Sequence, residues 1–190
     1  MSSKFTENIE ERKPVSSGKA VRRMGDRYLK WTAYGIVLLI ISIVQTIPHG
    51  IPEIFGVRPA PIAVAAVCIA MFEGPIGGAA AGIAAGVLWD LYSPRPMGFN
   101  SLWLMIMCCA CGLLSQMLVR NNLPSTMMVT SVVLIIQGLV NWFFNGVLAF
   151  KPDLMEILLR NALSAAYTFL ISPVVYLIIL LVSRILRRRE

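Results

Sequence analysis

Apolar residues occur in long runs that are separated by short polar breaks. The runs show neither the two-residue alternation of a half-buried strand nor the one-sided pattern of a soluble helix. Because a helix that crosses a bilayer needs about 20 predominantly apolar residues, the pattern predicts an all-α integral membrane protein. We expect one membrane domain over residues 31–187, with six spans at about residues 32–49, 59–73, 75–92, 99–119, 126–148 and 161–186.

Two features of the pattern bear on topology. The second run is short and rich in alanine, and a re-entrant pair in place of the second and third spans would preserve an even number of crossings. Before the sixth run, Leu154, Ile157 and Leu158 share one helical face, which predicts a short interfacial helix at residues 153–160.

Composition and charge agree with a membrane protein and orient it. The chain is 57% hydrophobic and only 14% charged, and its net charge of +7 is concentrated at the two ends. Residues 1–30 hold eight basic side chains, and Arg184 and Arg187–Arg189 close the chain. The positive-inside rule therefore predicts that both termini are cytoplasmic. We expect residues 1–30 to form a disordered basic arm that contacts anionic lipids and no nucleic acid.

Glycine recurs at every fourth residue of the third run, at Gly74, Gly78, Gly82 and Gly86, and Asp90 is the next step. Glycine weakens an isolated helix by about 1 kcal/mol relative to alanine, so an interaction outside the helix must offset this cost. In lipid, small residues allow two helix backbones to approach closely. We predict that these glycines pack against another helix of the chain and that their helix is central in the bundle. A groove for a partner's helix and a small-molecule cavity are the alternatives.

A carboxylate and a turn end the glycine-rich helix. A carboxylate near the end of a membrane helix is costly unless it is paired or hydrated, and Asp90 is therefore a functional candidate. Two prolines and a glycine follow as turn residues, after which Asn100 and Ser101 are suited to cap the next helix. We expect Asp90, Arg95 and Asn100 to form one polar cluster, as a capped, salt-bridged turn or as part of a functional surface.

Polar side chains at helical spacing mark the fifth and sixth runs. Residues three and four positions apart share one face of a helix. Amide and hydroxyl rows of this kind hydrogen-bond between membrane helices, and a polar binding cavity is the alternative. The rows consist of Gln137, Asn141 and Asn145 in the fifth run and of Asn161, Ser164, Thr168 and Ser172 in the sixth.

No residue pattern in the sequence is typical of catalysis or cofactor binding. The motifs G-x-S-x-G and H-E-x-x-H and the phosphate-binding loop are absent. Glu73 and Asp90 are predicted at opposite ends of one span. The four cysteines lie inside apolar runs, and the three of the Cys-Cys-Ala-Cys group are spaced too tightly for zinc. His49 is expected at a solvated interface. We therefore expect no enzyme activity, metal or cofactor.

The residues after the glycine row resemble the bacterial rod shape-determining MreD family. Trp89-Asp90-Leu91 precedes a Ser-Pro-Arg-Pro turn, and Met97-Gly98-Phe99-Asn100 leads into an apolar helix. The family pattern there is Asp-Leu, a short small-residue segment, Pro-Leu-Gly, one apolar residue and Asn. The methionine and the phenylalanine replace the commoner leucines, and the basic arm is longer than expected. The resemblance covers about residues 74–120, with Asp90, Pro96, Gly98 and Asn100 as its motif positions.

This resemblance implies a non-enzymatic membrane scaffold of the machinery that elongates the bacterial cell wall, located in the plasma membrane. It implies a six-helix fold similar to the substrate-binding components of energy-coupling-factor vitamin transporters. The implied partner is the transmembrane helix of MreC and, indirectly, MreB, RodA and a penicillin-binding transpeptidase. We expect the motif residues, together with Arg95, to shape the surface that binds this helix.

Two other functions stay open. A vitamin-uptake component would share the implied fold, but that family commonly carries an Ala-x-x-x-Ala pair on its first span, and Ala33 is the only alanine in the first span here. A lipid-handling protein is suggested by the polar rows of the fifth and sixth runs.

Overall fold

The computed structural model describes residues 17–47, 57, 59–93, 97–117, 122–144 and 154–187. These residues form five helices, all of them long and apolar enough to cross a membrane. The chain is therefore an all-helical, multi-pass membrane protein. The helices are α2 (Ser17–Thr46), α3 (Pro61–Asp90), α4 (Phe99–Met117), α5 (Leu123–Trp142) and α6 (Leu154–Arg187).

Two helices begin earlier than the sequence pattern indicated. The helix α2 starts at Ser17, so residues 17–30 of the expected disordered arm are helical in the structure, whereas residues 1–16 lie outside the described part. The helix α6 starts at Leu154 and runs without a break to Arg187. The prediction of a separate interfacial helix at residues 153–160 is therefore wrong, because its apolar face continues directly into the last span.

The predicted second and third spans belong to α3, which is broken at Gly74. This residue has φ +82° and ψ −170°, a combination that is essentially restricted to glycine. Pro75 follows, lacks a backbone N–H, and so cannot bond the Met71 carbonyl four residues earlier. The Ser115 hydroxyl of α4 donates to that carbonyl at 2.8 Å instead. Sequence and tertiary contacts thus both specify the break.

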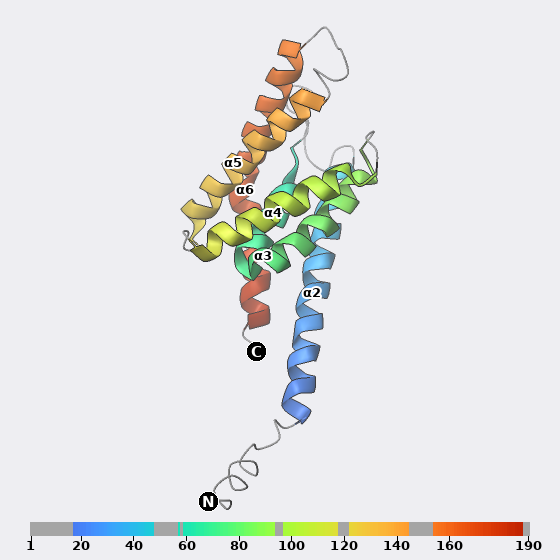
Figure 1. Ribbon diagram of the computed structural model, residues 1–190, viewed down its shortest axis with the longest axis vertical. Helices are drawn as coiled ribbons and strands as arrows, with labels where there is room; N and C mark the ends of the chain where they lie inside the picture. The colour runs from blue at the N-terminus through green and yellow to red at the C-terminus, as the bar shows by residue number, and fades with distance from the viewer. Residues whose placement is uncertain are drawn as a thin grey trace, which may run out of the picture.

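The chain reverses direction at this break. A Cβ atom built on Gly78 would lie 2.6 Å from the Ala70 Cβ, a contact that a straight helix forbids for residues eight positions apart. The segments 61–73 and 75–90 consequently form a V (Figure 1). At 1.5 Å per residue they are roughly 20 and 24 Å long, both shorter than the ~30 Å hydrocarbon core. Among the described residues there are five helices, one of them a hairpin, in place of the six separate spans expected.

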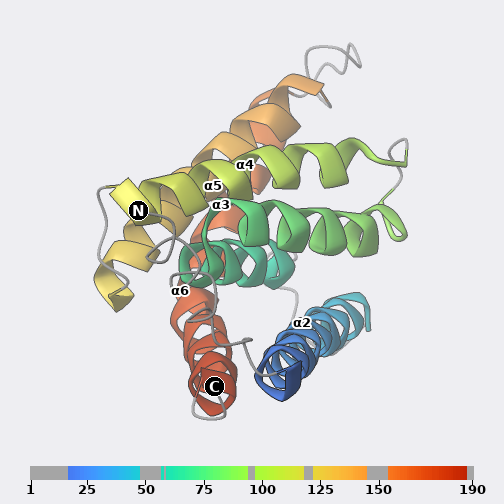
Figure 2. The same ribbon diagram turned by 60° about the horizontal axis from the view of Figure 1, so that its bottom comes forward.

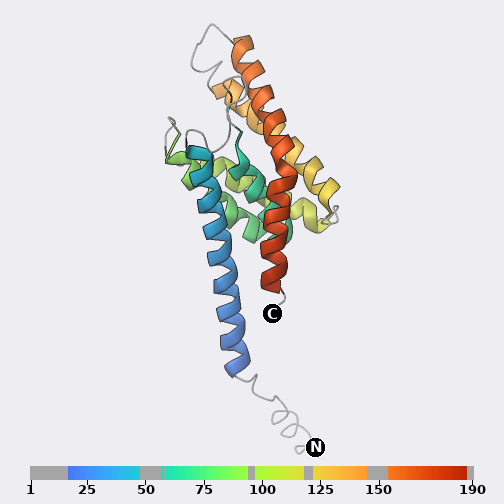
Figure 3. The ribbon, with the colours of Figure 1, turned by 180° about the vertical axis from the view of Figure 1, so that it is seen from behind.

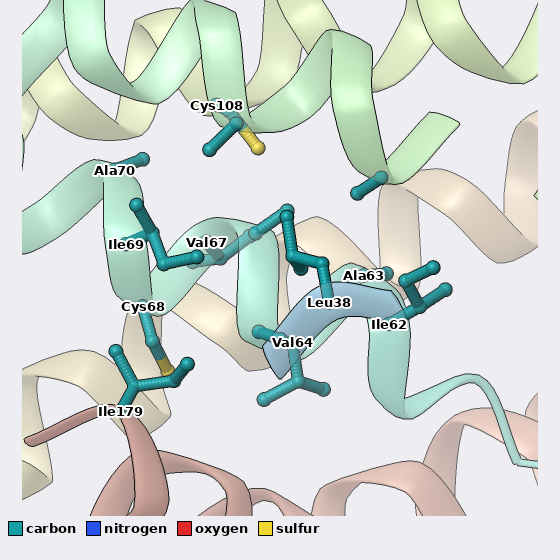
Figure 4. Close-up of a cluster of buried hydrophobic side chains, with 14 of the residues drawn as sticks. Leu38, Ile62, Ala63, Val64, Val67, Cys68, Ile69, Ala70, Cys108 and Ile179 are labelled. Atoms are coloured by element: carbon teal, nitrogen blue, oxygen red, sulfur yellow. The ribbon is translucent and has the colours of Figure 1, made fainter. Parts of the chain in front are cut away.

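The first segment of α3 is the centre of the molecule. Every residue from Pro61 to Met71 is buried, and in Figure 4 Cys108 of α4 lies on one side of the segment and Ile179 of α6 on the other. The prediction that the glycine-rich helix is central is wrong, because Ile76 and Val87 of the second segment are 88% and 48% exposed. The alanine-rich segment takes that place, since small side chains let four helices surround it.

The other four helices all contact α3. It contacts α2, α4, α5 and α6, most extensively α4, and α5 also pairs with α6. Figure 2 shows α2 and the carboxyl-terminal half of α6 on the side of α3 opposite α4. In Figure 3, α2 begins and α6 ends toward the same end of the molecule.

Candidate functional site

The glycine row of α3 lies against the backbone of α4. A Cβ atom built on Gly82 would lie 2.6 Å from the Leu104 carbonyl oxygen, and one built on Gly86 would overlap the Cα of Ser101. Real side chains essentially never approach backbone atoms this closely. The two helices are therefore as close as helices without side chains between them can be.

The contact continues toward the break with a constant register. A Cβ on Gly78 would lie 2.6 Å from the Cys108 carbonyl oxygen, and one on Gly112 of α4 would lie 2.6 Å from the Gly74 carbonyl carbon. Each step of four residues along α3 thus matches a step of four in the opposite direction along α4. The α4 residues on this row, Asn100, Leu104, Cys108 and Gly112, are all buried.

Asp90 closes the α3–α4 pair at its other end. Its Oδ2 accepts hydrogen bonds from the backbone N–H of Gly98 (2.9 Å), the N–H of Ser101 (3.2 Å) and the Ser101 hydroxyl (2.7 Å). Its Oδ1 accepts from the N–H of Asn100 at 3.1 Å. These N–H groups belong to the first turn of α4 and its approach, which have no partners within the helix. Asp90, only 6% exposed, therefore caps α4 from the end of α3.

This arrangement differs from the predicted cap. The side chains of Asn100 and Ser101 were expected to cap α4, but the structure has both backbone N–H groups bound to the Asp90 carboxylate. Asn100 is itself 2% exposed. Gly98 has φ +97°, and a Cβ built on it would meet nothing within 4 Å, so the turn needs glycine there for its backbone angle and not for space. Arg95 and Pro96 lie outside the described residues.

A second carboxylate holds the break at Gly74. Glu73 Oε1 lies 2.9 Å from the Lys30 ammonium, and both side chains are largely buried. The same oxygen accepts the Tyr34 hydroxyl at 2.9 Å, and both partners belong to α2. The sequence analysis missed this cluster, although a glutamate inside an apolar run next to a glycine-proline pair was a usable signal.

The polar rows of α5 and α6 line one cavity of about 290 Å³. It lies where α2, both ends of α3, α5 and α6 meet. The Thr168 hydroxyl accepts the Ala60 N–H at 3.1 Å and donates to the Ser164 carbonyl at 2.7 Å. The row residues on its wall are Gln137, Asn141, Asn161, Ser164 and Thr168.

Of the other two members of the predicted rows, only Ser172 is described by the structure. The Ser172 hydroxyl donates to the Phe169 carbonyl within α6, at 2.7 Å, and Ser172 does not line the cavity. Asn145 lies outside the described residues. One direct contact of the predicted kind joins α5 and α6 in the described part, from Asn161 Nδ2 to the Gly138 carbonyl at 3.4 Å. Most of the described row residues thus face the cavity.

An apolar groove adjoins this cavity on the outside of α5 and α6. It has a volume of about 360 Å³ and is lined by Leu139, Leu158 and Phe169 among others. Four residues line both spaces, and they form the wall between them. These wall residues are Leu134, Gly138, Asn161 and Ala165.

The described part of the chain contains no recognisable metal-binding site. No group of three or more His, Cys, Asp or Glu side chains is found there. Cys68, Cys108 and Cys111 are buried in the packed interior, and His49 lies outside the described residues.

Similarity to known proteins identifies the family to which the chain belongs. Neither the curated proteins nor the solved structures contain a match to the chain. The family model of rod shape-determining protein MreD matches residues 26–188, a stretch that includes α3 to α6 and most of α2. The match confirms the resemblance at the Asp90 turn. The chain therefore belongs to the MreD family.

Proposed function

We propose that the protein is a non-enzymatic scaffold of the cell-wall elongation machinery, which binds the transmembrane helix of MreC. Membership of the MreD family supports a role in rod shape determination. MreB, RodA and a penicillin-binding transpeptidase are then indirect partners. In this proposal both termini are cytoplasmic and the basic arm contacts anionic lipids.

The observation that carries the proposal is the rigid α3–α4 pair. Its inner face is closed by backbone contact along the glycine row, and its turn is tied by the Asp90 carboxylate. Gly78, Gly82 and Gly86 are buried against α4, so they support the pair from inside and do not meet a partner directly. A rigid pair of helices presents its outer side as a fixed surface.

We place the MreC contact on the outer face of the second α3 segment. Residues three, four and seven positions apart fall on one side of a helix, and exposed small residues let a partner helix approach closely. This side leads to the Asp90 turn, where the family motif lies. The α3 outer face consists of the large residues Ile76, Ile83 and Val87 and the small residues Ala80 and Ala84, and all five are exposed.

Photo-crosslinking tests this placement. A photoreactive amino acid at Ile83 or Val87 is expected to crosslink to MreC in cells, whereas one at Leu170 or Leu181, exposed residues of α6, is not. MreC adducts from the α6 positions alone would refute the placement on α3.

A bulky substitution separates binding from folding. Ala84→Phe on the α3 outer face should reduce co-purification of MreC at least tenfold while leaving thermal stability unchanged, because the side chain points away from the packed core. Val174→Phe, at an exposed position of α6, is the matched control and should leave co-purification intact. Equal retention of MreC by both variants would count against the scaffold surface.

One observation favours a second candidate, the substrate-binding component of an energy-coupling-factor vitamin transporter. The polar cavity has a volume of about 290 Å³. The smallest pockets that bind small molecules have a volume of about 300 Å³. Isothermal titration with riboflavin, thiamine and biotin tests this function. A stoichiometric complex with any of them would favour transport over the scaffold.

A further inference from the structure

The polar cavity lies at the end of the molecule opposite the beginning of α2 and the end of α6. Its wall includes Thr46, the last residue of α2, Asn141 near the end of α5 and Tyr92 just after α3. Since α2 begins on the side where α6 ends (Figure 3), the last residue of α2 is at the far end of the bundle. Tyr92 is 57% exposed, so the cavity borders the surface there. A water-soluble ligand would therefore enter from that side of the membrane.

The lining of the cavity is more polar than that of most ligand pockets. Eight of its sixteen lining residues carry an amide or an aliphatic hydroxyl, and none of the sixteen is charged. Pockets for drug-sized ligands and cofactors are mostly apolar, with a few polar groups that fix the orientation. An ionised ligand would lack a counter-charge here. The lining therefore matches a neutral ligand that carries hydrogen-bonding groups over most of its surface.

Two asparagines on the wall have hydrogen-bonding groups that the protein itself does not use. The side chain of Asn141 is half-buried and makes no hydrogen bond within the described residues. Asn161 is also half-buried, and its described hydrogen bond, to the Gly138 carbonyl, is long at 3.4 Å. Each amide offers two N–H donors and one carbonyl acceptor. A hydroxyl group matches both kinds, because it donates and accepts.

The size and the aromatic residues of the cavity narrow the class of ligand. A volume of 290 Å³ corresponds to about ten water molecules at ~30 Å³ each, which is roughly the space of one sugar ring. Trp89 and Tyr92 add aromatic rings to the wall, and the electron-rich face of such a ring attracts C–H groups. A sugar ring presents C–H groups on its faces and hydroxyls around its edge. A flat heterocycle carries fewer hydrogen-bonding groups and would leave much of the polar lining without partners.

We propose that the cavity binds a neutral, water-soluble sugar ring that enters from the side of the membrane opposite the beginning of α2 and the end of α6. Asn141 and Asn161 hydrogen-bond to its hydroxyls, and Trp89 and Tyr92 contact its C–H groups. The whole ligand lies within the cavity. This site is separate from the α3 outer face, so it adds sugar recognition to the proposed scaffold and does not depend on MreC.

Saturation-transfer difference NMR of the full chain in lipid nanodiscs tests the proposal. Nanodiscs are needed because glucoside and maltoside detergents carry sugar rings themselves. The probes are methyl glucoside, methyl galactoside and methyl N-acetylglucosaminide, and at least one is expected to bind with a Kd of about 1 mM or lower. Asn141→Leu should weaken this binding about three- to tenfold, the effect of one lost hydrogen bond. The same variant should keep the wild-type melting temperature, since Asn141 makes no described hydrogen bond.

Ser131→Leu is the matched control, because it also replaces a polar residue of α5 by leucine. Ser131 lines the groove and not the cavity, so this variant should bind the sugar as the wild-type protein does. Absence of binding by all three glycosides would overturn the proposal, as would binding that Asn141→Leu and Asn161→Leu leave unchanged. Displacement of a bound glycoside by riboflavin at lower concentration would also overturn it and assign the cavity to vitamin transport. Crosslinking of MreC at Ile83 is expected whatever the sugar result, so the scaffold is tested separately.

Discussion

Glu73 lies just before the break in α3 and Asp90 at the end of the helix, and both carboxylates have partners on a neighbouring helix. Asp90 accepts four hydrogen bonds from the start of α4 and its approach, and Glu73 pairs with Lys30 and Tyr34 of α2. A charge at a membrane helix end is costly unless it is paired. The two side chains therefore fix where the segment begins and ends and which helices it meets.

Replacing Asp90 by Asn tests the cap. Because Oδ2 accepts from three donors, an amide NH₂ in that place would face donors with another donor. We expect Asp90→Asn to lower the free energy of unfolding in detergent by about 1.5–3 kcal/mol. Glu156→Gln, which loses only an exposed pair with Arg160, should change it by less than about 0.5 kcal/mol. Equal stability of the two variants would mean that the turn does not depend on the carboxylate.

A double-mutant cycle tests the pair of Lys30 and Glu73. Glu73→Gln leaves a largely buried ammonium without its counter-charge, and we expect a loss of about 3 kcal/mol in unfolding free energy. Lys30→Met combined with Glu73→Gln removes both charges and should recover most of this loss, since Gln can still accept the Tyr34 hydroxyl. Additive losses in the double variant would argue against a coupled pair.

The helices α3 and α4 contact each other closely because glycines leave no side chains between their backbones. Along their contact, glycines on α3 face backbone atoms of α4, and Gly112 of α4 faces the break. In lipid no hydrophobic force drives two helices together, so close van der Waals contact is the main attraction. The same close contact does not tolerate larger residues at the glycine positions, because even one added methyl group has no room.

Glycine-to-alanine substitutions measure how much stability an added methyl group costs at this contact. Gly82→Ala and Gly86→Ala must displace the α4 backbone and are expected to destabilise the protein by about 1–3 kcal/mol each. Gly35→Ala and Gly138→Ala are matched controls, because a Cβ meets nothing within 4 Å at Gly35 and only an ordinary contact at 3.9 Å at Gly138. They should be neutral or slightly stabilising in thermal unfolding. Comparable melting temperatures for all four variants would contradict the packing described here.

At the level of the complete molecule, the V of α3 governs the topology. The chain enters and leaves α3 on the side where α2 ends and α4 begins, since Gly74 reverses its direction. Besides this hairpin the chain has four full-length helices. As a result, α2 begins and α6 ends toward the same end of the molecule. This arrangement agrees with an even number of crossings, whereas the cytoplasmic location of the two ends stays a prediction from the terminal arginines and lysines.

Reporter fusions test that prediction. A fluorescent protein fused after Glu190 should fluoresce and an alkaline phosphatase fused there should be inactive, as expected for a cytoplasmic terminus. A cysteine at the exposed Met97, next to the Asp90 turn, should react with a membrane-impermeant maleimide added outside the cells. Active phosphatase at Glu190 would reverse the orientation of the whole chain.

Most of the apolar helices, though not the pairs that they form, were readable from residue types. Long apolar runs predicted the α-helical membrane protein, and the four-residue glycine spacing predicted close packing inside the chain, which the structure places against α4. The turn after Asp90 was recognised by its prolines, its glycine and its resemblance to MreD. Local chemistry sufficed here because a missing side chain, a turn residue and an apolar run constrain the backbone wherever they occur.

What the sequence alone determined, then, is the class of protein, the approximate position of its apolar runs and the family, but not the hairpin in α3 or the early starts of α2 and α6. The central place of the alanine-rich segment, the salt bridge from α2 to Glu73 and the cap by Asp90 depend on which helices become neighbours. The same holds for the polar cavity, whose wall comes from four helices distant in the chain. Helical spacing tells which residues share a face, but only the packing of the other helices decides whether that face meets a partner, lipid or an open space.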